Sequence, residues 1–300
     1  MKSRESLRAQ IISNAICSIF TICAILPFLL LLIGSFTKNS WAVANGFSFF
    51  PKEWSLEAYR YIAVKWSMIG RGFIMTIIVT VLGTALSLLI STLFAYGISK
   101  QDIPGMKFVS FLLVFSMLFN GGLVATYYCY VNLFHIKDTI FALIVPNFLM
   151  NAFNVILIRN YFTSSIPASL EEAARIDVAS EFKTFRSIVL PLSKPIMATV
   201  GLLTALGYWN DWTNGLYYLT KRGGANLYTI QNILNNINEN IKALMQSSSS
   251  SNLVTGSVAD LPSTTVRMAI AVVGIIPIVC AYPFFQKYFV KGITLGGVKE

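Results

Sequence analysis

The chain has 300 residues, of which 55% are hydrophobic and 12% charged, whereas soluble domains carry roughly a quarter charged residues. A surface this apolar would aggregate in water but suits a lipid bilayer. The composition therefore excludes an ordinary soluble domain and predicts a polytopic membrane protein. The net charge of +10 does not indicate nucleic-acid binding, because the Lys and Arg residues are spread between apolar blocks instead of forming one basic stripe.

Six apolar blocks are each long enough to cross roughly 30 Å of hydrocarbon. In chain order they are Ile11–Phe36, Phe73–Ser99, Met106–Tyr130, Thr139–Ile158, Ile196–Leu219 and Val266–Phe289. The third is interrupted at 120–122 by Asn-Gly-Gly and the fifth at 210–211 by Asn-Asp. Irregular backbone at membrane depth must be covered by protein or by a water-filled cavity. The sequence therefore predicts an all-α membrane protein with six transmembrane helices, two of them irregular.

The distribution of Lys and Arg predicts the orientation of these spans. With the N-terminus inside, the cytoplasmic segments hold 13 of the 23 basic residues, in agreement with the positive-inside rule. The prediction is a multi-pass protein of the cytoplasmic membrane with both termini inside. Residues 1–10 and 291–300 are then cytoplasmic and residues 11–290 form the membrane domain, with external loops at 37–72 and 220–265. Within the second loop, apolar residues at helical spacing over 227–245 predict an external amphipathic helix.

The connection 165–195 between the fourth and fifth spans has the character of a cytoplasmic docking surface. Ser169 and Glu172 fit a capping box, and Pro167 suits a first helical turn. Ala173 and Ala174 are small and helix-forming. Glu171, Glu172 and Asp177 are carboxylates that a basic partner could meet, and Phe182 and Phe185 are apolar rings on a segment expected to face water. An amphipathic loop packed on its own bundle is the alternative.

The same loop closely resembles the EAA loop of ABC importer permeases. Glu172-Ala173-Ala174 and Asp177 are followed by Ile188-Val189-Leu190-Pro191 with the spacing of that motif. The resemblance implies that Leu190 and Pro191 belong to the coupling segment. It departs at Val178, where the family has Gly at a bend. Because a β-branched residue is unfavourable at φ > 0, we expect a bend with φ < 0 or a straighter coupling helix.

Further segments resemble the carbohydrate-uptake branch of this family, especially permeases for complex or uronate-containing oligosaccharides. They are 121–127, 151–154, 209–212 and 285–292. The resemblance implies a type I importer fold and a heterodimer with a second homologous permease subunit. It also implies two ATP-binding subunits that hold ATP-Mg, an extracytoplasmic solute-binding protein, and an oligosaccharide substrate.

Polar and aromatic residues inside two spans are candidates for the path of a sugar. Asn147, Asn151 and Asn154 have the spacing of one face of a helix in the fourth span. The fifth span offers a second group, in which Asp211 is ionisable: Tyr208, Trp209, Asn210, Asp211 and Trp212. Intramembrane ionisable residues are functional candidates, but amides also hold helices together, so both interpretations stay open.

Other classes of function fit less well. A single histidine, His135, and four cysteines without metal-type spacing give no metal or catalytic site. We expect no ATPase site and no cofactor in this chain, because no Gly-rich phosphate loop is present. A secondary transporter would leave the 165–195 loop unexplained, whereas an ABC permease for a non-sugar solute would share it.

Overall fold

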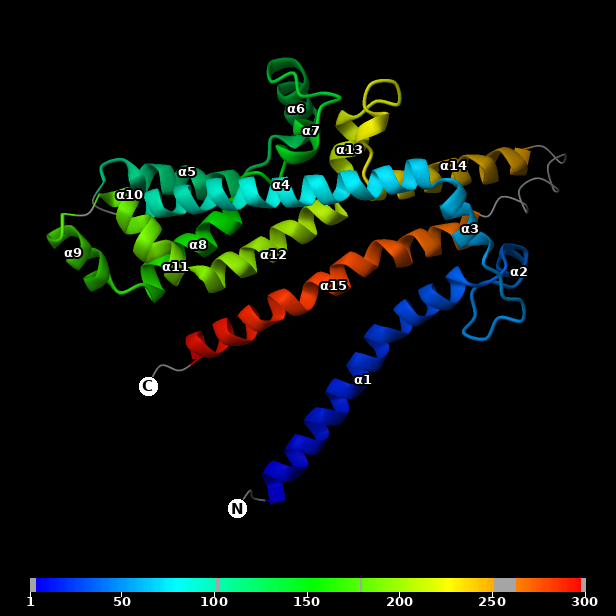
Figure 1. Cartoon of the computed structure of the whole chain (residues 1–300), viewed down its shortest axis with the longest axis horizontal. Coiled ribbons are helices and arrows are strands. Elements are labelled where there is room, and N and C mark those ends of the chain that lie inside the picture. The colour runs from blue at the N-terminus through cyan, green and yellow to red at the C-terminus, as the bar shows by residue number, and fades with distance from the viewer. Residues whose placement is uncertain (1–3, 101–102, 179, 251–262, 298–300) are drawn as a thin grey trace. The chain divides into compact units, whose positions relative to one another are not determined.

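The structure, a computed structural model, describes residues 4–100, 103–178, 180–250 and 263–297. Over these residues the regular elements are helical, and β-structure is confined to one bridge between Thr37 and Trp54 (Figure 1). The α-helices are α1 (Arg4–Ser35), α2 (Asn39–Asn45), α3 (Glu57–Val64), α4 (Trp66–Ser99), α5 (Met106–Leu118), α6 (Gly122–Tyr128), α7 (Phe141–Ile144), α8 (Ala152–Ser165), α9 (Ala168–Ile176), α10 (Glu181–Thr184), α11 (Leu190–Leu192), α12 (Lys194–Asn210), α13 (Thr213–Tyr218), α14 (Ile230–Ser250) and α15 (Ser263–Gly297). Two π-helical segments, η1 (Cys129–Leu133) and η2 (Phe185–Val189), and the 3₁₀ segment η3 (Ala225–Leu227) complete the set.

Among the residues that the structure describes, three helices are long and apolar enough to cross a membrane, and they match the first, second and last predicted spans. The qualifying runs are Gln10–Ser35, Trp66–Ser99 and Thr264–Pro283. The second begins seven residues earlier than Phe73, so the helix α4 takes in the end of the predicted 37–72 loop. That loop and the predicted 220–265 loop are not featureless: the first contains α2 and α3, and the second contains all of α14.

The interruption predicted in the third span is confirmed. The pair Met106–Leu118 and Gly122–Leu133 is bent by 119°, and the change of direction from α5 to α6 is visible in Figure 1. The side chain of Asn120 accepts the N–H of Gly122 at 2.9 Å, and Gly122 has φ 80°. The bend therefore follows from an Asx-type turn and from the left-handed conformation that glycine permits.

The prediction of one continuous helix over 139–158 is wrong. The chain forms only the four residues of α7, then a turn, and α8 begins at Ala152. Pro146 lies in the turn, where it has no N–H to donate to a helix, and Asn147 has φ 67°. The six-span count thus stays a prediction, because α8 has only 14 residues, fewer than the about 20 that a helix needs to cross the hydrocarbon core.

The chain forms two compact units, Met1–Ile69 with Leu234–Ile278 and Gly70–Ile233 with Val279–Glu300. In the first unit, residues after α1 fold into a small structure of their own. Ser55 donates its N–H to the carbonyl of Phe36 at 2.7 Å, Lys38 and Glu53 form an ion pair at 2.9 Å, and the ring of Phe36 stacks on Tyr59. Close to it in the same unit, Gly34 is packed against Met268 of α15.

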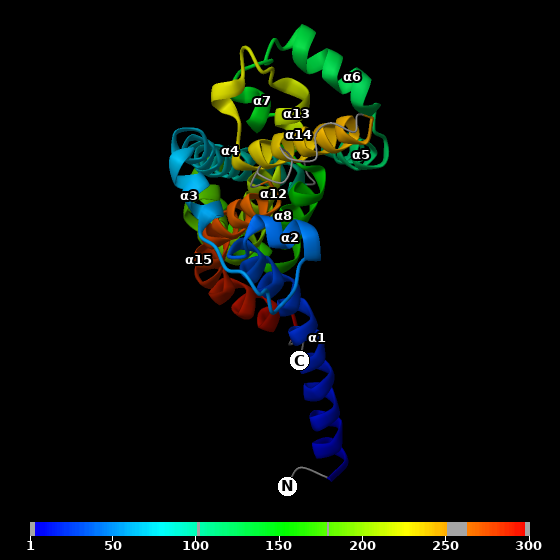
Figure 2. The same ribbon diagram turned by 90° about the vertical axis from the view of Figure 1, so that its right-hand side faces the viewer.

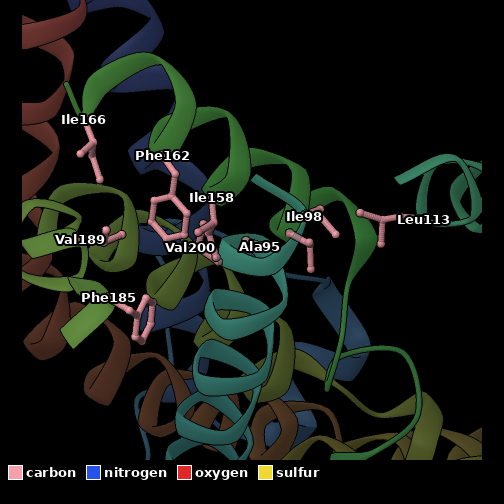
Figure 3. Close-up of a cluster of buried hydrophobic side chains, with 10 residues drawn as sticks. Ala95, Ile98, Leu113, Ile158, Phe162, Ile166, Phe185, Val189 and Val200 are labelled. Carbon is pink, nitrogen blue, oxygen red and sulfur yellow. The ribbon is translucent and has the colours of Figure 1, made fainter. Parts of the chain in front are cut away.

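The second unit contains the predicted docking loop and the predicted sugar path. Its helix α8 packs against α5 and α12, and α13 packs against α7 (Figure 2). A core cluster fills one end of this unit, where side chains from α4, α5, α8, α12 and the loop meet (Figure 3). Its buried members are Ala95, Ile98, Leu113, Val155, Ile158, Phe162, Ile166, Phe185, Val189 and Val200. The loop is therefore packed against the bundle by the same core that joins the helices.

The expected helix over 227–245 is present as α14, which starts three residues later at Ile230. Thr229 precedes it and its hydroxyl accepts the N–H of Asn232 at 3.4 Å, the arrangement of an N-cap. The first residues of the helix are anchored in the second unit, since Ile230 and Ile233 are buried there.

Candidate docking loop and solute pathway

The predicted docking loop folds as two helical segments with a bend between them. The first is α9, and the second runs from α10 through η2 to α11. The predicted capping box is wrong, because Pro167 is itself the N-cap residue and leaves Ser169 inside the first turn. Ser180 instead caps the second segment, where its hydroxyl accepts the N–H of Lys183 at 3.3 Å.

Val178 lies at the bend and has φ 55°. Both sequence expectations for this position are therefore wrong: the bend is made with positive φ although the residue is β-branched, and α9 ends at Ile176. A left-handed conformation costs an L-residue roughly 1–2 kcal/mol. The bend forms in spite of this cost. The side chain of Val178 is 90% exposed.

Replacement of Val178 by Gly is expected to stabilise the bend by about 1 kcal/mol, because glycine adopts positive φ without strain. The measurement is the rate of ATP hydrolysis coupled to transport, which should be unchanged or higher. Val178→Ala, which keeps a Cβ and the strain, is the matched control. A clear loss of coupled hydrolysis in both Val178→Gly and Val178→Ala would show instead that the valine side chain makes a required contact.

Charged side chains join the loop to the end of α4. Lys100, which directly follows α4, forms an ion pair with Glu171 of α9, and its ammonium lies 3.9 Å from a carboxylate oxygen of Glu181 in α10. Tyr96 donates its hydroxyl to Glu181 at 2.8 Å, and Arg175 lies 3.5 Å from the other carboxylate oxygen of Glu181. These five residues, Tyr96, Lys100, Glu171, Arg175 and Glu181, are called the charge cluster below.

Aromatic packing continues from the charge cluster into the core. The ring of Tyr96 contacts Phe185 and Phe162, with centroid distances of 5.0 and 6.3 Å. Phe185 is buried, so the expectation that it faces water is wrong. Phe185 packs against Tyr96 in the cluster shown in Figure 3, whereas Phe182, three residues earlier, stays exposed.

The outward side of the loop carries an apolar patch, defined as Ile176, Val178 and Phe182. Their exposed fractions are 81%, 90% and 67%. Exposed apolar groups rimmed by charges are typical of protein–protein contact sites, and Glu172 and Asp177 are exposed beside them. Of the other predicted coupling residues, Ala173, Leu190 and Pro191 are exposed, whereas Ala174 is buried.

The turn between α7 and α8 is a reverse turn centred on Asn147. The N–H of Phe148 donates to the carbonyl of Pro146 at 2.8 Å, and Asn147 between them has φ 67°. This is a γ-turn with positive φ, a strained form. Asn147 therefore lies outside the helix, and the prediction that it shares one helix face with Asn151 and Asn154 is wrong.

Side chains from other helices satisfy the carbonyl groups of this turn. Tyr208 donates its hydroxyl to Ile144 at 2.7 Å, and Ser87 of α4 donates to Phe148 at 2.9 Å. The side-chain amide of Asn214 donates to Pro146 at 3.2 Å. Irregular backbone within an apolar bundle requires such partners, and these contacts provide them.

Asp211 holds the predicted break between α12 and α13. One of its carboxylate oxygens accepts the N–H and the hydroxyl of Thr213, at 3.0 and 2.7 Å, and the N–H of Asn214 at 3.3 Å. These bonds satisfy the first donors of α13, as a helix cap does. The interruption predicted at 210–211 is confirmed, and it gives the buried carboxylate a structural role.

The predicted pathway residues divide into a buried and an exposed group. Asn154 is buried and donates to the hydroxyl of Thr204 at 3.2 Å, and Tyr208, Trp209 and Asp211 are buried as well. The exposed group consists of Asn147, Asn151, Asn210 and Trp212. Asn147 and Asn151 still have one bond each, to Asn214 at 3.3 Å and from the N–H of Asn154 at 3.2 Å.

Comparison with known proteins gives the class to which these features belong. The family model described as "Binding-protein-dependent transport system inner membrane component" matches residues 60–295. The chain belongs to this family. A permease of this kind is a transport component of a membrane and not itself an enzyme.

Individual relatives match over almost the whole chain. The polygalacturonan/rhamnogalacturonan transport system permease protein YtcP of Bacillus subtilis is 39% identical over 93% of this permease and 94% of its own length. Protein LplC of the same organism is 36% identical over 92% and 89%. A solved structure, of a bacterial ABC transporter involved in the import of the acidic polysaccharide alginate, matches with a TM-score of 0.77 and 30% identity, covering 96% of this permease and 99% of that chain.

Some groups of the permease's sites were absent from the sequence prediction. Tyr96, Lys100 and Glu181 were not among the candidate residues, and neither was Ser87. The only sequence signal for Lys100 is its position as the first charged residue after a long apolar helix, and a lone serine in an apolar run gives none. Within the described ranges, no group of three or more His, Cys, Asp or Glu side chains could hold a metal ion.

Proposed function

We propose that this permease forms the membrane path of an ATP-driven importer for an oligosaccharide delivered by an extracytoplasmic solute-binding protein. The observation that carries the proposal is similarity along almost the full chain to permeases named for polysaccharide transport. Relatives named for arabinooligosaccharides and for melibiose, raffinose and stachyose support the same substrate class. Two of the glycans in these names, polygalacturonan and alginate, are acidic.

The outward patch of the docking loop is the proposed contact for an ATP-binding subunit. It combines three exposed apolar side chains with the exposed carboxylates of Glu172 and Asp177, which complement a partner with an apolar groove and basic rim. In this proposal two ATP-binding subunits, which hold ATP-Mg, act on this permease and on a second homologous permease. Both termini are placed in the cytoplasm, with six crossings of the lipid bilayer.

For the sugar path, we favour the exposed group over the buried group. Asn151, Asn210 and Trp212 expose amides and an aromatic ring, the groups that hydrogen-bond and stack on a sugar. The buried side chains of Tyr208, Asn154 and Asp211 are engaged in bonds that hold the fold. We therefore assign the buried group the role of shaping the path, and the exposed group the role of contacting the solute.

The test is ATP hydrolysis and uptake by the full complex, purified through a tag on this chain and reconstituted in liposomes. The expected result is co-purification of an ATP-binding subunit, and hydrolysis stimulated by the binding protein loaded with an acidic or neutral oligosaccharide. Trp212→Ala should lower uptake severalfold, whereas Trp54→Ala, an exposed tryptophan in the 37–72 loop, serves as control. Uptake that needs an ion gradient and no ATP would favour a secondary transporter, and stimulation by peptides or amino acids alone would favour a non-sugar permease.

A further inference from the structure

The charge cluster is the feature that the proposed function leaves without a role. Its central group is Lys100, whose side chain is 11% exposed and faces carboxylates from both helical segments of the loop. Lysine is almost never buried to this extent unless it is paired. Removing its charge would leave Glu171 without its ion-pair partner in a half-buried site, so the arrangement depends on Lys100.

The cluster joins the two helical segments of the loop to each other and to α4. Between α9 and α10 the chain bends at Val178 with positive φ, and Arg175 lies 3.5 Å from a carboxylate oxygen of Glu181 across this bend. Lys100 and Tyr96 attach both segments to the same point of α4. A displacement of either segment therefore acts on the end of α4.

The opposite end of α4 is attached to the residues that lead into α14. Arg71 donates to the side chain of Asn226, and the hydroxyl of Thr76 accepts the N–H of Ile230 at 2.9 Å. Gly72 allows a close approach, because a Cβ at this position would lie 2.5 Å from Ile233. The helix between these ends has 34 residues and no proline, and it is about 50 Å long at 1.5 Å per residue.

We infer that Lys100 and Tyr96 are positioning residues that connect the docking loop through α4 to the 226–233 segment at the other end of the helix. The inference rests on the proposed function, in which the loop contacts an ATP-binding subunit and the 226–233 segment lies in the external 220–265 loop, on the side from which the binding protein delivers the solute. Events at one side of the membrane are then transmitted to the other along one helix that is tied at both ends. Loss of the ion pairs of Lys100 uncouples the two sides without removing the apolar patch.

The experiment compares variants of the reconstituted full complex by one ratio, the rate of ATP hydrolysis with loaded binding protein divided by the rate without it. Lys100→Met, which keeps the length of the side chain and removes its charge, is expected to lower this ratio at least about fivefold, the lower range of coupling between sites. Hydrolysis without binding protein should stay within about twofold of the wild type. Lys100→Arg should retain the ratio, because the charge is kept.

Lys107→Met is the matched control, since Lys107 is an exposed lysine at the start of α5, near Lys100 in the chain. It should leave the ratio unchanged.

Tyr96→Phe is the second variant in case Lys100→Met does not assemble. It keeps the ring in the core, loses only the bond to Glu181, and should lower the ratio about twofold. An unchanged ratio in an assembled Lys100→Met complex overturns the inference. If Lys100→Met does not assemble, an unchanged ratio in Tyr96→Phe overturns it. A decrease of the ratio in Lys107→Met as large as that in Lys100→Met overturns it as well. A wild-type complex without any stimulation would contradict the proposed function instead.

Discussion

Replacement of Phe182 by Asp is expected to weaken the association of the permease with its ATP-binding subunit at least about 30-fold, which corresponds to about 2 kcal/mol. The ring is 67% exposed and belongs to the apolar patch with Ile176 and Val178 of the same loop. A carboxylate there would be desolvated on docking without a partner, which is costly. The measurement is the Kd of the purified permease heterodimer for the ATP-binding subunit in detergent.

Phe182→Leu is the control for this prediction, because it keeps an apolar side chain of similar size at the same place. It should change the Kd less than about fivefold, within the range of a conservative apolar exchange. The permease alone should keep its stability in both variants, since exposed positions contribute little to folding. A wild-type Kd in Phe182→Asp would show that the loop does not dock through this patch.

The sequence predicted the helical character of the 165–195 loop well because the signals for it are local. Helix-forming residues, the position of Pro167 and the fixed spacing from Glu172 to Pro191 lie within one short segment, and the structure has helical segments there. The prediction was wrong where a second element decides the outcome. Phe182 and Phe185 look alike in the sequence, and only the packing of Tyr96 against Phe185 distinguishes the exposed ring from the buried one.

The spans show the same contrast between local and distant causes. For a long apolar run without proline such as α4, the prediction gave the last residue and missed the first by seven, because hydropathy and helix propensity agree there. The block 139–158 is also apolar but contains Pro146, and it does not form one helix. Its turn at Asn147 is stabilised by hydrogen bonds from Tyr208, Ser87 and Asn214, which come from distant parts of the chain. No local sequence pattern predicts these hydrogen bonds.

For the candidate path, the sequence identified the right residue types but could not separate their roles. An amide in an apolar run must find a partner or reach water, and both outcomes occur here. Asn154 meets Thr204 in the interior, whereas Asn210 donates to the carbonyl of Leu206 within its own helix and stays exposed. Burial, which depends on how helices pack, is therefore the information that the sequence lacked.

Replacement of Gly83 by Ala is expected to lower the free energy of unfolding by about 3 kcal/mol. A Cβ at Gly83 would lie 2.5 Å from the ring of Tyr208, which is 1% exposed and donates its hydroxyl to the carbonyl of Ile144. Overpacking of a core costs about 1–3 kcal/mol, and breaking a buried hydrogen bond adds about 1–3 kcal/mol. The measurement is denaturant unfolding of the purified permease in detergent, together with its Tm.

Gly97→Ala provides the matched control, because Gly97 lies in the same helix and a Cβ there meets nothing within 4 Å. It should leave stability unchanged or raise it by up to about 1 kcal/mol, since alanine favours a helix more than glycine does. Tyr208→Phe separates the two costs of the first variant. In that background the hydrogen bond to Ile144 is already lost, so Gly83→Ala should cost about 1 kcal/mol less than in the wild type. Equal costs in the two backgrounds would mean that the clash leaves this bond intact.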